Sequence, residues 1–189
     1  KSIPAFNKTN KVPEDFSFGE FPENFDHFEP YLEKSFHRLP MLETAGIRKF
    51  FSGPESFTPD TQYLLGETPE VKNFYTCCGF NSIGIASSGG AGRVTAEWMI
   101  NGHINEDLFS LDIKRFQNFH SSKKFIMERV TETLGDLYGM HWPYKQHSTS
   151  RNQKLLPYHD ELKKAGACFG VAGGFERPMW YSLNGEEPN

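Results

Sequence analysis

A glycine-rich segment from Gly79 to Gly92 holds the residues whose types and spacing best suit ligand chemistry. It reads Gly79-Phe-Asn-Ser-Ile-Gly-Ile-Ala-Ser-Ser-Gly-Gly-Ala-Gly92, after a predicted strand over 71–78 and before a predicted helix through Val94, Trp98 and Met99. A strand, a glycine turn and a helix start bring backbone N–H groups and the positive helix end to an anion or an electron-rich ring. Its glycines also remove side chains where a flat ligand must lie against backbone.

The spacing of these glycines leaves two interpretations open. It is neither the Gly-x-Gly-x-x-Gly of a first Rossmann turn nor a P-loop, because no Lys-Ser/Thr pair follows. The segment either approaches a ligand or lets a helix pack closely on a sheet without one. The pattern by itself favours the two interpretations about equally.

Other catalytic signatures are weaker or absent from the sequence. There is no Gly-x-Ser-x-Gly elbow and no His-Glu-x-x-His, and the seven histidines show no metal-ligand spacing. Glu55 and Asp60 flank a proline-rich turn and form a candidate carboxylate pair, although such residues more often cap turns. Cys77 and Cys78 point to opposite faces of a strand, so with Cys168 we expect buried free thiols in a reducing compartment.

The composition narrows the class of protein. The 189 residues are 37% hydrophobic and 23% charged with a net charge of −4, which is typical of a soluble globular protein that binds neither nucleic acid nor an anionic membrane. No apolar run approaches the roughly 20 residues of a membrane-spanning helix. The sequence begins with Lys1 rather than with a start methionine, and no targeting segment follows. We therefore expect it to be a piece of a longer protein.

The elements that position the glycine segment follow from hydrophobic periodicity. Residues 1–24 are predicted to be loop with at most a short strand at 16–18, followed by a helix from an Asp26/Glu29 capping box to Pro40. Short strands are predicted over 47–51 and 62–65, and a stronger strand over 71–78. The helix after the glycine segment is predicted to end in a left-handed cap at Asn101-Gly102.

The later part of the sequence has a different character. We expect a helix over about 120–138 with Ile126, Val130, Leu134 and Leu137 on its buried stripe. After a loop over 140–156, the pattern predicts a short helix over 157–165, a strand over 167–173 and a turn over 174–180. The fold class is therefore α+β, with a soft domain boundary near 110–118.

Several segments, in order, resemble the dimethylglycine and sarcosine dehydrogenase family, whose members are built like D-amino acid oxidase with a C-terminal folate-binding domain. The earlier motifs are Leu39-Pro-Met-Leu-Glu-Thr-Ala-Gly-Ile-Arg48, Gly53-Pro-Glu-Ser-Phe-Thr-Pro-Asp60, Leu65-Gly-Glu-Thr-Pro-Glu70, Gly79 to Gly92 and Ala96-Glu-Trp98. The later ones are Asp112-Ile-Lys-Arg-Phe116, His141-Trp-Pro143 and Gly174-Phe-Glu-Arg-Pro-Met-Trp180. The resemblance covers nearly the whole chain and is weakest over residues 1–24.

The resemblance implies an organisation in two parts. Residues 1–110 would be the C-terminal part of an FAD-dependent oxidoreductase domain with the FAD/NAD(P)-binding fold of D-amino acid oxidase. Residues 111–189 would be part of a mixed α/β central connecting domain that leads to a folate-binding domain beyond the chain. The first Rossmann turn, which holds the FAD diphosphate in the family, has no counterpart in this sequence.

The resemblance also implies which residues contact the cofactor. Its flavin-contacting segment corresponds to Phe80, Asn81, Ser82, Ile83, Gly84 and Ile85, with backbone facing the flavin pyrimidine ring and Asn81 and Ser82 bordering the site. Gly89, Gly90 and Gly92 would let the helix pack close behind. Ala86 stands near the position of a lysine in simpler sarcosine oxidases, so no catalytic residue is assigned here.

The implied reaction is oxidation of an N-methyl group on a small secondary or tertiary amine. Hydride passes to FAD, and the imine is hydrolysed to formaldehyde or transferred to tetrahydrofolate. The expected location is the bacterial cytoplasm or the mitochondrial matrix, and unpaired strand edges predict association with itself or with the rest of a parent chain. Two alternatives remain: a non-catalytic regulatory or scaffold homologue, and an unrelated α+β domain whose glycines only pack.

Overall fold

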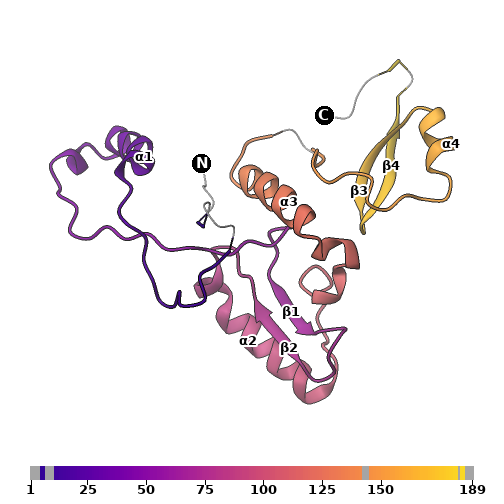
Figure 1. The fold of residues 1–189 in the computed structure, drawn as a ribbon, viewed down its shortest axis with the longest axis horizontal. Helices are drawn as coiled ribbons and strands as arrows, with labels where there is room; N and C mark the ends of the chain where they lie inside the picture. Colours follow the sequence, from indigo (N-terminus) through magenta and orange to yellow (C-terminus); the bar gives the residue numbers. More distant parts are fainter. Residues whose placement is uncertain (1–4, 7–10, 142–144, 183, 186–189) are drawn as a thin grey trace. The chain divides into compact units, whose positions relative to one another are not determined.

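The structure, a computed structural model, describes residues 5–6, 11–141, 145–182 and 184–185. Two compact units divide the chain: one is Ile3–Glu55, and the other comprises Ser56–Asn189 together with Lys1–Ser2. Figure 1 traces the elements of both units along the chain. Trp142 and Pro143 of the His141-Trp-Pro143 motif lie outside the described residues.

The unit Ile3–Glu55 contains α1 (Phe25–Arg38) and a 3-10 turn, η1 (Pro40–Glu43). The predicted helix is confirmed, but its predicted capping box is wrong, because Asn24 is the N-cap and accepts a hydrogen bond from the His27 amide at 2.9 Å. The predicted strand over 47–51 is also wrong. An isolated bridge between Phe21 and Ser52 lies just after this segment. Within the segment, the Phe50 ring stacks on the Phe25 ring, with the ring centroids 4.8 Å apart.

The unit that includes Ser56–Asn189 begins with a hairpin of β1 (Leu64–Glu67) and β2 (Tyr75–Cys78), which are antiparallel. Helix α2 (Gly84–Asn101) lies along this hairpin (Figure 1) and buries Ala91, Val94, Thr95 and Trp98. The close approach needs Gly66, because a Cβ there would lie 2.4 Å from the Trp98 ring. Gly102 ends α2 with a φ of 76°, so the predicted left-handed cap is confirmed.

Two predictions about this region are corrected. Of the strand predicted over 71–78, only the last four residues form β2. The earlier residues form a turn instead, because Asn73 takes a φ of 63°. The Glu67 carboxylate closes this turn by accepting a hydrogen bond from the Asn73 amide at 2.7 Å. Helix α2 begins at Gly84, so most of the glycines lie in the helix rather than in the turn. Apart from the adjacent residues and the backbone of α2 itself, no described atom lies within 4 Å of a Cβ built on Gly89, Gly90 or Gly92. The close packing expected there is therefore not formed within the described residues.

Short 3-10 turns η2 (Ile113–Arg115) and η3 (Asn118–Ser121) lead to α3 (Lys123–Asp136), which confirms the predicted helix. Its predicted buried stripe is wrong: Phe125, Arg129 and Thr133 are the buried residues. The face is polar because it binds the loop over 145–151. Carboxylates one helical turn apart hold that loop, with Glu128 bonded to Ser150, Glu132 to Ser148 and Thr149, and Asp136 to Lys145.

The chain ends in α4 (His159–Lys164) and an antiparallel hairpin of β3 (Ala167–Ala172) and β4 (Phe175–Tyr181). The turn predicted over 174–180 is wrong, because only Gly173 and Gly174 turn the chain, at φ values of 58° and 80°, and β4 starts immediately afterwards. Glu176 on β4 is 2% exposed and pairs with Arg151. The mixture of helices and short antiparallel strands agrees with the α+β class.

Candidate functional site

The turn between β2 and α2 contains three residues in unusual backbone conformations. Gly79, Asn81 and Ser82 have φ values of 67°, 48° and 70°, in the left-handed region that only glycine and a few polar residues enter easily. The Ile83 amide closes the turn on the Phe80 carbonyl at 3.0 Å. This conformation aims the chain directly from the strand into the helix.

Asn81 holds the turn in place through its side chain. Its carboxamide is 5% exposed; Oδ1 accepts the Thr58 amide at 2.8 Å, and Nδ2 donates to the Gly79 carbonyl at 2.5 Å and to Thr58 Oγ1 at 3.1 Å. A flipped amide would set NH2 against the Thr58 N–H, so these contacts determine its orientation. The side chain is therefore committed to the protein interior, and only backbone and neighbouring side chains remain for a ligand.

The start of α2 presents a positive helix end beside exposed apolar side chains. The N-cap residue is Ile83, whose side chain has no hydrogen-bond acceptor, and the first turn contains no acidic residue. Ile83 is 46% exposed and Ile85 is 99% exposed. Next to them, the Phe80 ring stacks on the Tyr63 ring, with the ring centroids 4.8 Å apart. An uncapped helix start flanked by apolar groups fits the electron-rich edge of a planar ring system.

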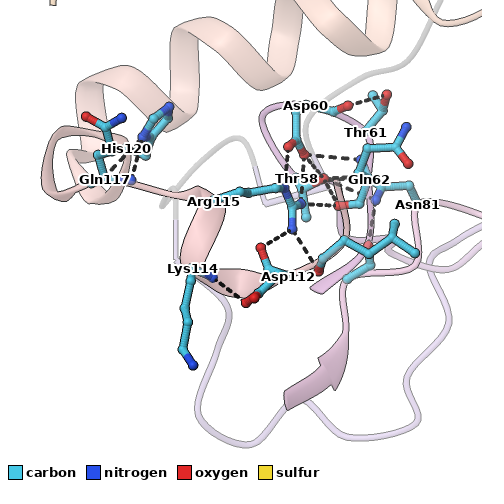
Figure 2. A network of polar contacts seen from close by, with 12 residues as sticks. Thr58, Asp60, Thr61, Gln62, Asn81, Asp112, Lys114, Arg115, Gln117 and His120 are labelled. Carbon is cyan, nitrogen blue, oxygen red and sulfur yellow. Dashed lines mark hydrogen bonds and ion pairs between the residues drawn. The ribbon is translucent and has the colours of Figure 1, made fainter. Parts of the chain in front are cut away.

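Arg115 connects the neighbouring loop to the segment that follows α2 (Figure 2). Its guanidinium forms a bidentate ion pair with Asp60, with Nε–Oδ2 and Nη2–Oδ1 distances of 2.6 and 3.0 Å. Asp60 also accepts the Gln62 amide at 3.2 Å. These contacts give Asp60 a structural role, and Glu55 lies in the other compact unit, so nothing in the structure supports the candidate carboxylate pair.

His120 stands beside this network in Figure 2. Burial lowers its pKa, and Nδ1 accepts the Gln117 amide at 2.9 Å, which only an unprotonated nitrogen can do. Among the residues described, no group of three or more His, Cys, Asp or Glu could hold a metal ion. Cys77 and Cys78 are exposed rather than buried as expected, because β2 forms an edge of the hairpin, whereas Cys168 is buried.

A separate hollow of about 400 Å³ lies beside α4 and β3. Arg151, His159, Lys163, Phe169 and Glu176 are among its lining residues. Burial raises the pKa of Glu176, but the hydrogen bonds from Arg151 and the Asn152 amide outweigh it and lower the pKa below its usual value. The glycine turn contributes nothing to this hollow.

Comparison with known families assigns both parts of the chain. Residues 7–98 match the family described as FAD dependent oxidoreductase, and residues 101–155 match its central domain, described as FAD dependent oxidoreductase central domain. The chain therefore belongs to the FAD-dependent oxidoreductases, within the group that carries this central domain.

Individual relatives place it within that group. It is 41% identical over 171 residues to 4-methylaminobutanoate oxidase (formaldehyde-forming) of Paenarthrobacter nicotinovorans, which covers 90% of this chain and 21% of that protein. It is 38% identical over 173 residues to mitochondrial sarcosine dehydrogenase of Mus musculus, covering 91% and 19% respectively. The mitochondrial pyruvate dehydrogenase phosphatase regulatory subunit of the same organism is 39% identical over 159 residues, covering 84% and 18%.

The chain spans about a fifth of the length of the relatives that it matches. Dimethylglycine dehydrogenase of Mus musculus is more distant, at 25% identity. None of the helices in the described part of the chain is long and apolar enough to cross a membrane.

The structure brings three of the resemblance motifs together. Thr58 and Asp60 belong to the motif over 53–60, Asn81 to the glycine segment, and Arg115 to the motif over 112–116; all four join one hydrogen-bonded network. Sequence reasoning missed Thr58 and Arg115 as partners of the turn. The available signal was that all three motifs carry polar residues without an assigned role, but spacing along the chain cannot show which of them meet.

Proposed function

We propose that this chain is part of an FAD-dependent oxidoreductase that oxidises N-methyl groups of secondary or tertiary amines, and that Phe80 to Ile85 contact the flavin. The observation that carries the proposal is the uncapped start of α2 at Ile83, reached through a left-handed turn, in a chain of this family. Sarcosine dehydrogenase and 4-methylaminobutanoate oxidase, both about 40% identical, support an N-methyl amine as the substrate class.

Different residues of the turn would make different contacts with the cofactor. Backbone N–H groups at the start of α2 would stabilise negative charge on the pyrimidine edge of the flavin, and Ile83 and Ile85 would cover apolar ring surface. At Asn81 only the backbone would face the ring, because the side chain is buried against Thr58 and positions the turn. Bound there, FAD supplies the acceptor for a hydride from the N-methyl carbon, and the resulting imine would yield formaldehyde or methylene-tetrahydrofolate.

The proposal includes the organisation expected from sequence. Residues 1–110 would complete an FAD domain and residues 111–189 would lead to a folate-binding domain, with the protein in the mitochondrial matrix or the bacterial cytoplasm. The families that match over 7–98 and 101–155 support a division in this part of the chain. Ile100 and Phe109, which are 82% and 74% exposed and lie outside the turn, support association with further polypeptide.

Flavin retention by the full-length protein tests the proposed contact. Gly84→Val should weaken FAD binding by roughly tenfold or more, since a Cβ at this position would already lie 3.3 Å from the Phe80 Cβ and would displace the ring beside the turn. Visible absorption after ultrafiltration measures the retained flavin. Gly90→Val is the matched control, because it makes the same substitution in the same helix where the added side chain meets open space. Equal retention by the two variants would refute the contact.

A second candidate is a regulatory flavoprotein homologue without turnover, which the 39% identity to the phosphatase regulatory subunit favours. It would bind FAD in the same turn but would not bleach when sarcosine or 4-methylaminobutanoate is added without oxygen. Bleaching by either amine supports the enzyme, and a stable yellow protein supports the regulatory homologue. A protein that remains colourless with added FAD would exclude both.

A further inference from the structure

Arg115 is the most fully bonded side chain of the network in Figure 2. Its five N–H groups meet five acceptors: both Asp60 carboxylate oxygens and the carbonyls of Gln62, Leu111 and Asp112, at 2.6–3.1 Å. The side chain is 8% exposed. A lysine has three N–H groups and no planar fork, so it cannot reproduce this pattern.

The network continues from Arg115 to the turn in three hydrogen bonds. Nη2 donates to the Gln62 carbonyl at 2.8 Å, the Thr58 hydroxyl donates to the same oxygen at 2.8 Å, and Asn81 Nδ2 donates to that hydroxyl at 3.1 Å. A hydroxyl has one hydrogen, so the shorter contact with Gln62 takes it and leaves the oxygen free to accept from Asn81. Every link is then a donor facing an acceptor.

The segment that carries Arg115 is itself tied to the hairpin. The Leu65 amide donates to the Leu111 carbonyl at 2.9 Å, and Leu65 and Asp112 form a parallel bridge on β1. Asp112 caps η2 by accepting the Lys114 amide at 2.8 Å. Arg115 therefore approaches the 58–62 loop from a fixed backbone, so the position of the loop depends on the guanidinium rather than the reverse.

From this geometry we infer that Arg115, in the region matched by the central-domain family, is a positioning residue for the turn over 79–85. It orders Thr58, and Thr58 holds Asn81 in the left-handed conformation that starts α2. Its consequence for flavin binding rests on the proposed function; the mechanical coupling between Arg115 and the turn does not. The central domain thereby adjusts the geometry of a turn to which it contributes no contact residue.

Hydrogen exchange by mass spectrometry on the full-length protein tests the coupling. Arg115→Lys should speed exchange in peptides covering 56–62 and 79–85 by roughly tenfold to a hundredfold, as expected when hydrogen bonds to a charged group are lost. Peptides covering 167–176 should not change. Arg151→Lys is the matched control, because Arg151 forms the same bidentate pair with Glu176. It should change exchange at 147–152 and 167–176, where its other hydrogen bonds lie, and leave 56–62 and 79–85 unchanged.

A second pair of variants tests the middle of the path. Thr58→Val removes the hydroxyl between Gln62 and Asn81 and should loosen 79–85, whereas Thr58→Ser keeps the hydroxyl and should restore protection. If Arg115→Lys prevents folding, this pair decides the question alone. Equal exchange in Thr58→Val and Thr58→Ser, or no change at 79–85 in Arg115→Lys, would overturn the inference.

The flavin readout separates this inference from the proposed function. In a flavin-loaded protein, Arg115→Lys and Thr58→Val should shift the flavin reduction potential and its visible band, and Arg151→Lys should leave both unchanged. Faster exchange at 79–85 in a protein that never binds FAD supports the coupling and refutes the proposed function. An unchanged flavin potential and band in Arg115→Lys, together with faster exchange at 79–85, refutes the proposed contact and leaves the coupling. Unchanged exchange at 79–85 in an Arg115→Lys protein that binds FAD overturns the inference alone.

Discussion

Two arginine–carboxylate pairs in this chain differ in which partner is buried, the arginine or the carboxylate. In the pair beside the turn, Arg115 is 8% exposed and Asp60 is 37% exposed. In the pair on the β3–β4 hairpin, Glu176 is 2% exposed and Arg151 is 23% exposed. An ion left buried without its partner costs several kcal/mol, while a partly exposed ion can be solvated. The buried partner therefore determines which substitution in each pair is severe.

Arg151→Met should produce the largest loss of stability, because it leaves the Glu176 carboxylate buried without its cation. We expect a loss of about 3–5 kcal/mol, measured as the free energy of unfolding in urea. The double variant Arg151→Met with Glu176→Met should recover much of this loss, since no charge remains buried. Asp60→Asn is the mirror case and should cost less, because Arg115 keeps three carbonyl acceptors. Equal losses in Arg151→Met and Asp60→Asn would break the comparison.

Acid should loosen the loop over 145–151, where Glu132 supplies a third kind of carboxylate site. Burial raises the pKa of Glu132, but hydrogen bonds from Ser148 and Thr149 outweigh it and lower the pKa from 4.5 to about 2. Because the folded-state pKa lies below the ordinary value, this stabilisation is complete above about pH 4.5 and is lost as the pH falls toward 2.

The size of this acid effect should be about 1.5–3 kcal/mol, the usual worth of hydrogen bonds to a charged group. Urea unfolding at a series of pH values measures it, and Glu132→Gln should remove the dependence in this window. Glu128, which accepts a hydrogen bond from Ser150 and pairs with Lys124 at 3.9 Å, supplies the control through Glu128→Gln. A pH profile that is the same in wild type and Glu132→Gln would contradict the assignment.

The smallest effect is expected at His159, where the polar group is buried without compensation. His159 is 8% exposed, its Nδ1 has no hydrogen-bond partner among the described residues, and its ring lies 4.3 Å from Phe169. His159→Phe keeps the ring contact and should raise the free energy of unfolding by roughly 0.5–1 kcal/mol. His159→Ala, which loses the ring, should lower it. A destabilised His159→Phe would show that Nδ1 has a partner in the full-length protein.

Sequence predicts the positions of the helices and strands better than it predicts which of their side chains are buried. The helices and the glycine turn follow from periodicity and caps, which are local properties. The buried stripe of α3 was predicted at Ile126, but Arg129 and Thr133 are buried instead. Arg129 binds Thr149 in a loop 20 residues away, and Thr133 bonds the Arg129 carbonyl of its own helix. The second strand of the last hairpin was missed, since Gly173-Gly174 alone makes the turn and Pro178 is unusual within a strand.

The candidate site could be predicted only in part, because some of its contacts join residues that are far apart in the sequence. Residues 80–85 follow from the motif, but whether Asn81 touches a ligand or the protein depends on Thr58, which lies 23 residues earlier. The resemblance therefore locates the turn without specifying what each side chain does. Arg115 is 55 residues from Asp60, and no local pattern connects the two. Long-range hydrogen bonds of this kind are visible only once the chain is folded.

The packing of Trp98 over Gly66 gives the turn-bearing region an intrinsic optical probe. Trp98 is 8% exposed and packs against Gly66 of the β1–β2 hairpin, so its fluorescence should be blue-shifted while α2 stays docked. Trp180, at 42% exposed, reports on the other hairpin from a wetter environment. In a variant with the third tryptophan replaced, Trp142→Phe, emission wavelength can therefore distinguish which of the two hairpins opens first, without a label.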